Sequence, residues 1–292
     1  MLSIDDKDRI RILTAVATRG ARYQLTRIAV ITFSNLVLLA VPLSGLVRLD
    51  LWGGHHLLLG EPAEGLDALK GVIIAIAALW GTTFLSNMIV GRFFCGWGCP
   101  VGYVSRLGED AQIKHRPGRT LRWLGSHLAG AGFVGTFIAA VMLWWVDWRV
   151  MLDGTPLAKG VVLGTWLLLC VGGYLHGFMW RFGFCKTVCP IGLYYRFVTS
   201  STPIGIRFSN EPSPCIECGA CEKICPVDLD PKNLGQAVAG DTPSDGVDDE
   251  PMRYGDAECI RCGDCVEACA MIFKGHPGET PPLRFGKVER AD

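Results

Sequence analysis

The segment FCGWGCPVG at residues 94–102 decides the fold, because it recurs as FCKTVCPIG at residues 184–192. Each copy directly follows a pair of long apolar stretches and contains a C-x₃-C-P motif. The proline after the second cysteine favours a bend away from a helical turn. The repeat therefore predicts two similar halves, each made of a helix, a loop, a second helix and a cysteine-bearing turn at one membrane face.

The apolar stretches are long enough to cross a membrane. A spanning helix needs about 20 apolar residues at a rise of about 1.5 Å each, and none of the stretches contains Lys, Arg, Asp or Glu. Half of the 292 residues are hydrophobic and 19% are charged, against about 25% charged in a typical soluble domain. These features predict an α-helical membrane protein and exclude a soluble enzyme. The four expected spans are Ile28–Val47, Gly71–Val90, Leu128–Val146 and Val161–Trp180.

Basic side chains are unevenly distributed along the chain, although Lys+Arg and Asp+Glu balance at 28 each. They are concentrated in residues 1–27 and in the connection at 91–127, and are sparse in the other two connections. Connections rich in Lys and Arg face the cytoplasm. We therefore expect a multi-pass protein of the bacterial inner membrane with both termini in the cytoplasm and an uncleaved N-terminal anchor. The balanced charge gives no indication of a nucleic-acid partner.

Eight further cysteines form one pattern that is written twice. The run C-x₂-C-x₂-C-x₃-C starts at Cys215 and again at Cys259. This is the spacing of bacterial two-cluster ferredoxins, in which the fourth cysteine of each run ligates the other cluster. Zinc sites use a different ligand pattern, and a disulfide scaffold does not suit a reducing cytoplasm. We expect an α+β domain with two [4Fe–4S] clusters, one held by Cys215, Cys218, Cys221 and Cys269, the other by Cys259, Cys262, Cys265 and Cys225.

The chemistry of the C-x₃-C-P turns stays open from sequence. Their four cysteines could bind a metal or cluster, pair as redox disulfides, or pack at helix ends. His176, near the end of the fourth span, and His127, at the start of the third, could accept a proton in a quinol pocket or hydrogen-bond at the membrane interface. Joint ligation of a b-type haem is a further alternative, which no second histidine pair supports. Cys170 lies in mid-span and is expected to pack. The catalytic candidates are Cys95, Cys99, Cys185, Cys189 and His176.

The domain organisation follows from these motifs. Acidic residues between 241 and 250 separate the two ferredoxin runs and predict a solvated loop. The expected parts are a basic cytoplasmic N-terminus (1–27), membrane repeat 1 (28–107), membrane repeat 2 (108–200), the two-cluster ferredoxin domain (201–275) and a tail (276–292).

Four spans, two C-x₃-C-P turns and a double ferredoxin motif together resemble the NapH-type membrane ferredoxin family, and are similar to the NosR membrane module and to MauN. The resemblance implies a quinol dehydrogenase-type electron-transfer subunit rather than a free-standing enzyme. It implies that electrons pass from quinol to a dedicated periplasmic redox system, with a ferredoxin or periplasmic redox protein as partner. The MauN-like and NosR-like branches imply an alternative role in maturation or assembly of a periplasmic metalloenzyme.

Overall fold

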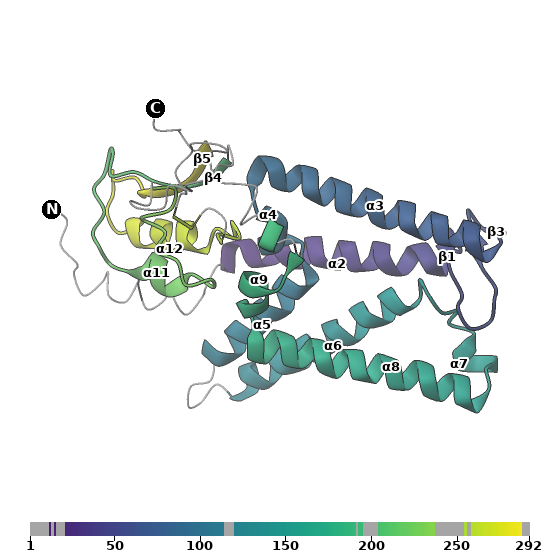
Figure 1. Cartoon of the computed structure of the whole chain (residues 1–292). Coiled ribbons are helices and arrows are strands. Elements are labelled where there is room, and N and C mark those ends of the chain that lie inside the picture. Colours follow the sequence, from purple (N-terminus) through teal and green to yellow (C-terminus); the bar gives the residue numbers. More distant parts are fainter. Residues whose placement is uncertain are drawn as a thin grey trace. The chain divides into compact units, whose positions relative to one another are not determined.

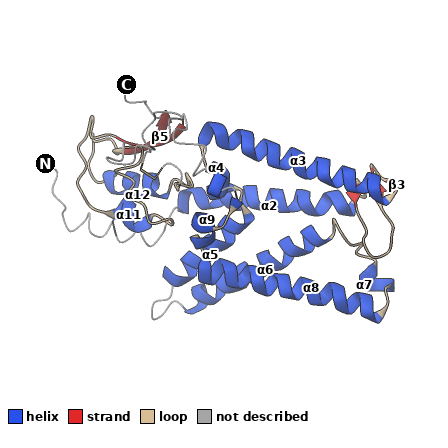
Figure 2. Ribbon diagram, in the orientation of Figure 1, coloured by secondary structure: helices blue, strands red, loops and turns tan. Residues whose placement is uncertain are grey.

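The computed structural model describes residues 12, 15, 21–113, 120–190, 192–194, 204–236, 254–255 and 258–287. Most of the basic N-terminus, the acidic loop at 241–250 and the last five residues lie outside the described residues. The described chain is rich in helices, and its strands are short (Figure 2). It forms two compact units. Unit 1 comprises Met1–Ile28, Leu85–Cys99 and Phe182–Asp292, and unit 2 comprises Ala29–Phe84 and Pro100–Arg181.

Four helices are long and apolar enough to cross a membrane, as the sequence predicts. Only 11% to 17% of the residues in each apolar window are buried, so most of the apolar side chains face outward. Such exposure suits lipid, where a helix satisfies its own backbone hydrogen bonds. The helices are α2 (Ala21–Leu43), α3 (Gly65–Val90), α6 (Thr120–Met142) and α8 (Pro156–Leu175), the last continued by the π-helix η1 (His176–Trp180).

The sequence prediction places the ends of the first and third spans a few residues beyond the ends of the helices in the structure. The first helix stops at Leu43, because Gly45 takes a left-handed φ of 76° and Val47 begins strand β1 (Val47–Arg48). The third stops at Met142, and the carbonyls of Trp144 and Trp145 instead accept the N–H groups of Leu49 and Leu51, each at 2.9 Å. Apolar composition alone did not reveal these backbone pairings.

In unit 2, helix α6 packs against α5 (Pro100–Ile113) and α8, as Figure 1 shows. Helix α5 also packs tightly on η1. A Cβ on Gly108 would lie 2.5 Å from the Gly177 carbonyl oxygen, so the close approach requires glycine. Beside this contact lies a buried cluster of Val104, Leu107, Val134 and Phe178, against which Cys170 packs, as expected.

The loops at the other end of these helices contain a small buried polar core. Strands β1, β2 (Leu57–Leu58) and β3 (Glu61–Pro62) form an antiparallel sheet, and the short helix α7 (Val150–Asp153) follows. Arg48 and Asp147 form a buried ion pair at 2.7 Å. Burial raises the pKa of Asp50, but the N–H groups of Gly53, Trp52, Asp147 and His55 outweigh it, and the pKa lies below its usual value.

Unit 1 contains the cysteine motifs. Strand β4 (Ile204–Phe208) pairs antiparallel with β5 (Leu283–Lys287), in the register Ile204 opposite Lys287. Residues 283–287, which sequence reasoning leaves in the tail, thus form part of this sheet. Helices α11 (Ala220–Ile224) and α12 (Asp264–Phe273) pack on each other, and α12 packs on β5. Two further short helices, α4 (Phe93–Trp97) and α9 (Gly183–Thr187), contain the first cysteine of each C-x₃-C-P turn.

Candidate metal centre

The two ferredoxin motifs bend their backbones in the same way. In the first, Glu217 (φ 56°) and Gly219 (φ 68°) flank Cys218; in the second, Arg261 (φ 53°) and Gly263 (φ 81°) flank Cys262. Each glycine begins a short helix, α11 or α12. Left-handed backbone at a residue with a side chain is costly and is found mainly where a site requires it. The sharp bends let closely spaced cysteines line one hollow.

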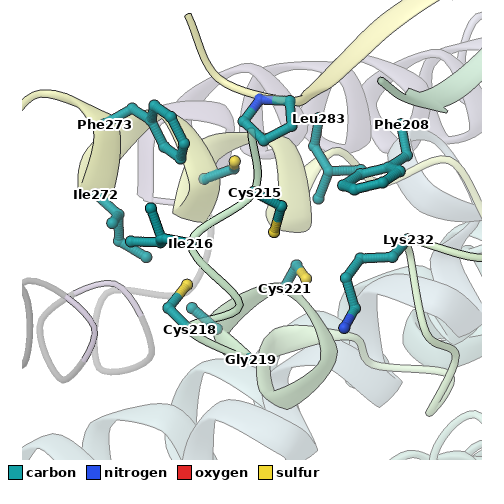
Figure 3. Close-up of a pocket in the computed structure, with 13 residues that line it drawn as sticks. Phe208, Cys215, Ile216, Cys218, Gly219, Cys221, Lys232, Ile272, Phe273 and Leu283 are labelled. Atoms are coloured by element: carbon teal, nitrogen blue, oxygen red, sulfur yellow. The ribbon is translucent and has the colours of Figure 1, made fainter. Parts of the chain in front are cut away.

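The first hollow has about 380 Å³ of free space, part of it open to solvent. Figure 3 shows the side chains that line it. Three of its cysteines come from the first motif and its neighbouring helix, and Cys269 comes from α12 of the second. Apolar side chains, among them Phe208, Ile216 and Leu283, form most of the remaining wall, and Lys232 is the one charged residue among the described residues of the lining. The backbone N–H of Glu217 donates to Cys215 Sγ at 3.4 Å. The lining cysteines are Cys215, Cys218, Cys221 and Cys269.

The second hollow has about 300 Å³ of free space, part of it open to solvent, and its cysteines are arranged in the reverse way. Three of its cysteines belong to the second motif, and Cys225 comes from the first. The backbone N–H of Leu229 donates to Cys225 Sγ at 3.4 Å, a contact of the kind that stabilises a thiolate ligand. Ile206 and Leu234 are among the apolar lining residues. The lining cysteines are Cys225, Cys259, Cys262 and Cys265.

Burial and mutual repulsion raise the pKa values of several of these thiols, so they resist ionisation unless a bound metal centre supplies positive charge. Burial, followed by repulsion from Cys218, Asp230 and Cys215, raises the pKa of Cys221 to about 12. Burial also raises the pKa of Cys269 to about 12, and thiols of the first motif add to the effect. A buried set of four thiols is therefore suited to a cationic metal centre that holds them as thiolates.

Two buried arginines, Arg27 and Arg261, lie at the second motif. Arg27, from α2, forms an ion pair with Asp264 at 2.8 Å and also donates to the Cys262 carbonyl. The guanidinium lies 5.0 Å from the Trp97 ring centroid. Arg261 donates to the Ile204 carbonyl at 2.9 Å. Positive charge near a cluster is one of the factors that set its reduction potential.

The two C-x₃-C-P turns share one hydrogen-bond pattern. The N–H groups of Gly98 and Cys99 both donate to the Phe94 carbonyl, and those of Val188 and Cys189 both donate to the Phe184 carbonyl. In each turn a five-residue helix carries a buried first cysteine, Cys95 or Cys185, and the second, half-buried cysteine follows the helix.

Arg92 joins the two turns. Its side chain is buried, donates to the Cys185 carbonyl at 2.8 Å and interacts with the Cys95 thiol. Burial raises the pKa of Cys185 to about 11, with a further contribution from the Cys95 and Cys189 thiols, while Arg92 opposes the rise. Sequence reasoning missed Arg92. An available signal was the Arg-Phe pair that precedes the cysteines of both repeats, at residues 92–93 and 181–182.

The histidine candidates lie in unit 2, where the structure distinguishes them. His127 Nδ1 and the Tyr174 hydroxyl are 2.5 Å apart, and the His127 ring stacks on Phe178 with centroids 4.7 Å apart. His176 begins η1 and lies edge-on to Trp180 at 6.0 Å. Sequence reasoning did not identify Tyr174. It precedes the histidine of the same span by two residues, a spacing that pattern alone does not mark.

Among the described residues, no three His, Cys, Asp or Glu side chains are grouped for a single metal ion. This holds for the ferredoxin cysteines as well as for the membrane-edge turns. Thiolates around a four-iron cluster each bind a different iron atom, so a cluster does not require them to converge on one point. The two hollows fit the cluster chemistry expected from the sequence.

Comparison with known proteins agrees with this chemistry. A family model described as a 4Fe-4S dicluster domain matches residues 207–270. A second, a 4Fe-4S binding domain, matches residues 71–117 and again residues 162–207, so each match contains one C-x₃-C-P turn. No solved structure matches the chain significantly.

Curated relatives cover much of the chain. The ferredoxin-type protein NapH of Haemophilus influenzae is 27% identical over 84% of this chain and 80% of its own length. NapH of Escherichia coli is 26% identical over 73% and 72%, respectively. The methylamine utilization ferredoxin-type protein MauN of Methylorubrum extorquens is 29% identical over 57% of this chain and 60% of its own. The chain is a homologue of the NapH and MauN ferredoxin-type proteins.

This homology confirms the resemblance found in the sequence. The NapH- and MauN-like chain contains 4Fe–4S ferredoxin domains and four helices of membrane-spanning length. It is a membrane protein of iron–sulfur electron transfer.

Proposed function

We propose that the chain takes electrons from quinol in the bacterial inner membrane and passes them, through two [4Fe–4S] clusters, towards a periplasmic redox enzyme system. The observation that carries this proposal is the pair of cysteine-lined hollows in unit 1. Each is lined by three cysteines of one motif and the fourth of the other, which is the arrangement of a two-cluster electron carrier. We assign Cys215, Cys218, Cys221 and Cys269 to one cluster and Cys259, Cys262, Cys265 and Cys225 to the other.

The residues around the hollows support one-electron transfer. When bound, the clusters supply a reversible one-electron couple each. Crossed ligation keeps the two sites close, because Cys225 and Cys269 each belong to one motif and line the hollow of the other. Arg261, buried within the second motif, favours an added electron at the second site, whereas the charge of Arg27 is offset by its ion pair with Asp264.

Quinol oxidation also releases protons, and unit 2 contains a group suited to accept them. Conversion of one quinol to quinone yields two electrons and two protons. The two electrons would leave one at a time, and a neutral imidazole can accept one of the two protons, while water takes up the other. His127, hydrogen-bonded to Tyr174, is our first candidate for this role, and His176 is the second.

Membrane orientation and partners complete the proposal. The concentration of basic residues before the first helix and after the second supports cytoplasmic termini. The ferredoxin motifs follow the fourth helix and would then lie at the cytoplasmic face. We propose a ferredoxin or a periplasmic redox protein as the partner, because electrons held by the clusters need a redox-active acceptor.

The test is electron exchange with quinone in anaerobic proteoliposomes that contain the full-length chain. Low-temperature EPR follows the clusters after addition of ubiquinol or menaquinol, and in a second arm quinone is added to dithionite-reduced protein. For every two electrons exchanged, we expect one quinone to form in the first arm and one quinol to form in the second. If dithionite reduces the clusters but no quinol or quinone exchanges electrons with them, the quinol route is wrong. The maturation role implied by the MauN-like relatives would then replace it.

A further inference from the structure

The four cysteines of the C-x₃-C-P turns belong to neither ferredoxin hollow. All four lie within unit 1. Cys95 and Cys185 are 7% and 6% exposed, and each is close enough to Cys189 for their charges to interact. Cys99 occupies in its turn the position that Cys189 occupies in the other, because both donate to the equivalent phenylalanine carbonyl. The thiols of Cys95, Cys185 and Cys189 are thus near one another, and the equivalent place of Cys99 in the first turn makes it the candidate for a fourth thiol.

A buried cation accompanies this group. Arg92 is 3% exposed and interacts with the first cysteine of both turns. Gly192 keeps the second turn close to it, since a Cβ there would lie 2.3 Å from the Cys185 carbonyl oxygen and 3.1 Å from Arg92 Nη2. Thiolates of a negatively charged metal centre would interact favourably with this buried cation.

The group also lies against the second ferredoxin motif. A Cβ on Gly96, between the cysteines of the first turn, would lie 2.4 Å from the Ile260 carbonyl oxygen and 3.2 Å from the Cys262 nitrogen. Trp97 Nε1 donates to the Arg261 carbonyl at 3.0 Å. The first turn therefore packs directly on the backbone of the second cluster motif.

We infer that Cys95, Cys99, Cys185 and Cys189 together bind a third [4Fe–4S] cluster, shared between the two repeats. Neither repeat alone provides the four thiolates that such a cluster needs. The 4Fe-4S binding domain model matches each repeat over its turn, which agrees with a site built from two halves. This inference rests on the proposed function, in which the added site would transfer one electron at a time between quinol and the cluster of the second motif.

Iron and acid-labile sulfide are to be counted in anaerobically purified full-length protein. Three clusters predict about 12 iron atoms per chain, and two predict about 8. Cys189→Ser, at a half-buried position, and Cys95→Ser should each lower the count to between about 8 and 11. Cys170→Ser is the matched control, because Cys170 belongs to neither turn and packs against the buried cluster of unit 2, and it should leave about 12.

Each alternative result has a distinct meaning. About 8 iron atoms in the unsubstituted chain, unchanged by Cys189→Ser, would overturn the third cluster and leave the two-cluster proposal intact. Fewer than about 8 would count against both. A disulfide between the turns, detected by alkylation and mass spectrometry, or stoichiometric zinc lost in Cys189→Ser, would also overturn it. Mössbauer spectra of Cys95→Ser show whether the ferredoxin clusters persist, which separates loss of the site from misfolding.

Discussion

The ion pair between Arg27 and Asp264 allows the sharpest test of how the membrane helix α2 supports the second cluster motif. Asp264 lies between Cys262 and Cys265 in the sequence. The side chains of Arg27 and Asp264 are 2% and 1% exposed, respectively. Asp264→Asn keeps the shape and one acceptor oxygen but removes the negative charge. It leaves the Arg27 guanidinium buried against the Trp97 ring.

The expected effect can be worked from the distance. At an effective dielectric constant of about 20, unit charges 2.8 Å apart attract by about 6 kcal/mol. Desolvation cancels part of this, and removal of one partner from a buried pair typically costs about 3–5 kcal/mol. We expect about 3 kcal/mol for Asp264→Asn, because the amide oxygen still accepts a hydrogen bond. About 1.4 kcal/mol is a tenfold change, so local opening should become about a hundredfold more frequent.

The assay is anaerobic release of iron to a chelator, followed by the loss of visible cluster absorption. The rate is measured where it is proportional to chelator concentration, since it then reports the opening equilibrium rather than the opening rate. Asp228→Asn is the matched control: Asp228 pairs with Lys186 in the same unit at 3.0 Å but is 87% exposed. We expect that control to change release less than about threefold.

Two results would refute this reasoning. One is Asp264→Asn releasing iron no faster than Asp228→Asn. The other is failure of the double substitution Arg27→Met with Asp264→Leu to recover most of the loss, since replacement of both charges in a buried pair is often close to neutral.

Three further predictions concern other parts of the chain. Gly96→Ala should lower the free energy of local opening by about 1–3 kcal/mol in the same chelator assay, because its Cβ would meet the Ile260 carbonyl. The control Gly132→Ala, with open space around its Cβ, should leave it unchanged. Equal effects of the two substitutions would contradict the close packing at Gly96. Tyr174→Phe should keep the iron content but slow the reduction of the clusters by quinol at least about tenfold, measured by stopped-flow bleaching of the cluster absorption. An unchanged rate would exclude the His127–Tyr174 pair as the proton acceptor. Asp50 has a lowered pKa, so its carboxylate stabilises the fold above about pH 4, and this contribution is lost as the pH falls through its folded pKa. The thermal unfolding temperature of Asp50→Asn should therefore lose that part of its pH dependence. The same dependence of unfolding temperature on pH in Asp50→Asn and the unsubstituted chain would contradict this.

Sequence alone predicted what depends on composition and spacing. The four membrane-length helices follow from uncharged stretches such as Gly71–Val90, and the cysteine motifs follow from their intervals. The end of the third helix was not predictable, because it depends on Trp144 and Trp145 pairing with Leu49 and Leu51, far away in sequence.

The candidate site was predictable to the same extent. Short intervals identify all eight ferredoxin cysteines, but Arg27, the buried cation that contacts the second motif from α2, comes from a distant segment. Arg27 reaches a motif 235 residues away, and Arg92 reaches Cys185 across the repeat. Such contacts depend on tertiary packing, which periodicity and spacing do not encode.

The crossed assignment of the two clusters is tested most directly by EPR of dithionite-reduced single variants of the full-length chain. Serine at Cys225, Cys221 or Cys259 removes one ligand each and alters the signal of the cluster it served. The hollows predict that Cys225→Ser alters the same signal as Cys259→Ser, although Cys225 belongs to the run of Cys221. A Cys225→Ser spectrum that matches Cys221→Ser would contradict crossed ligation and, with it, the proposed close pair of clusters.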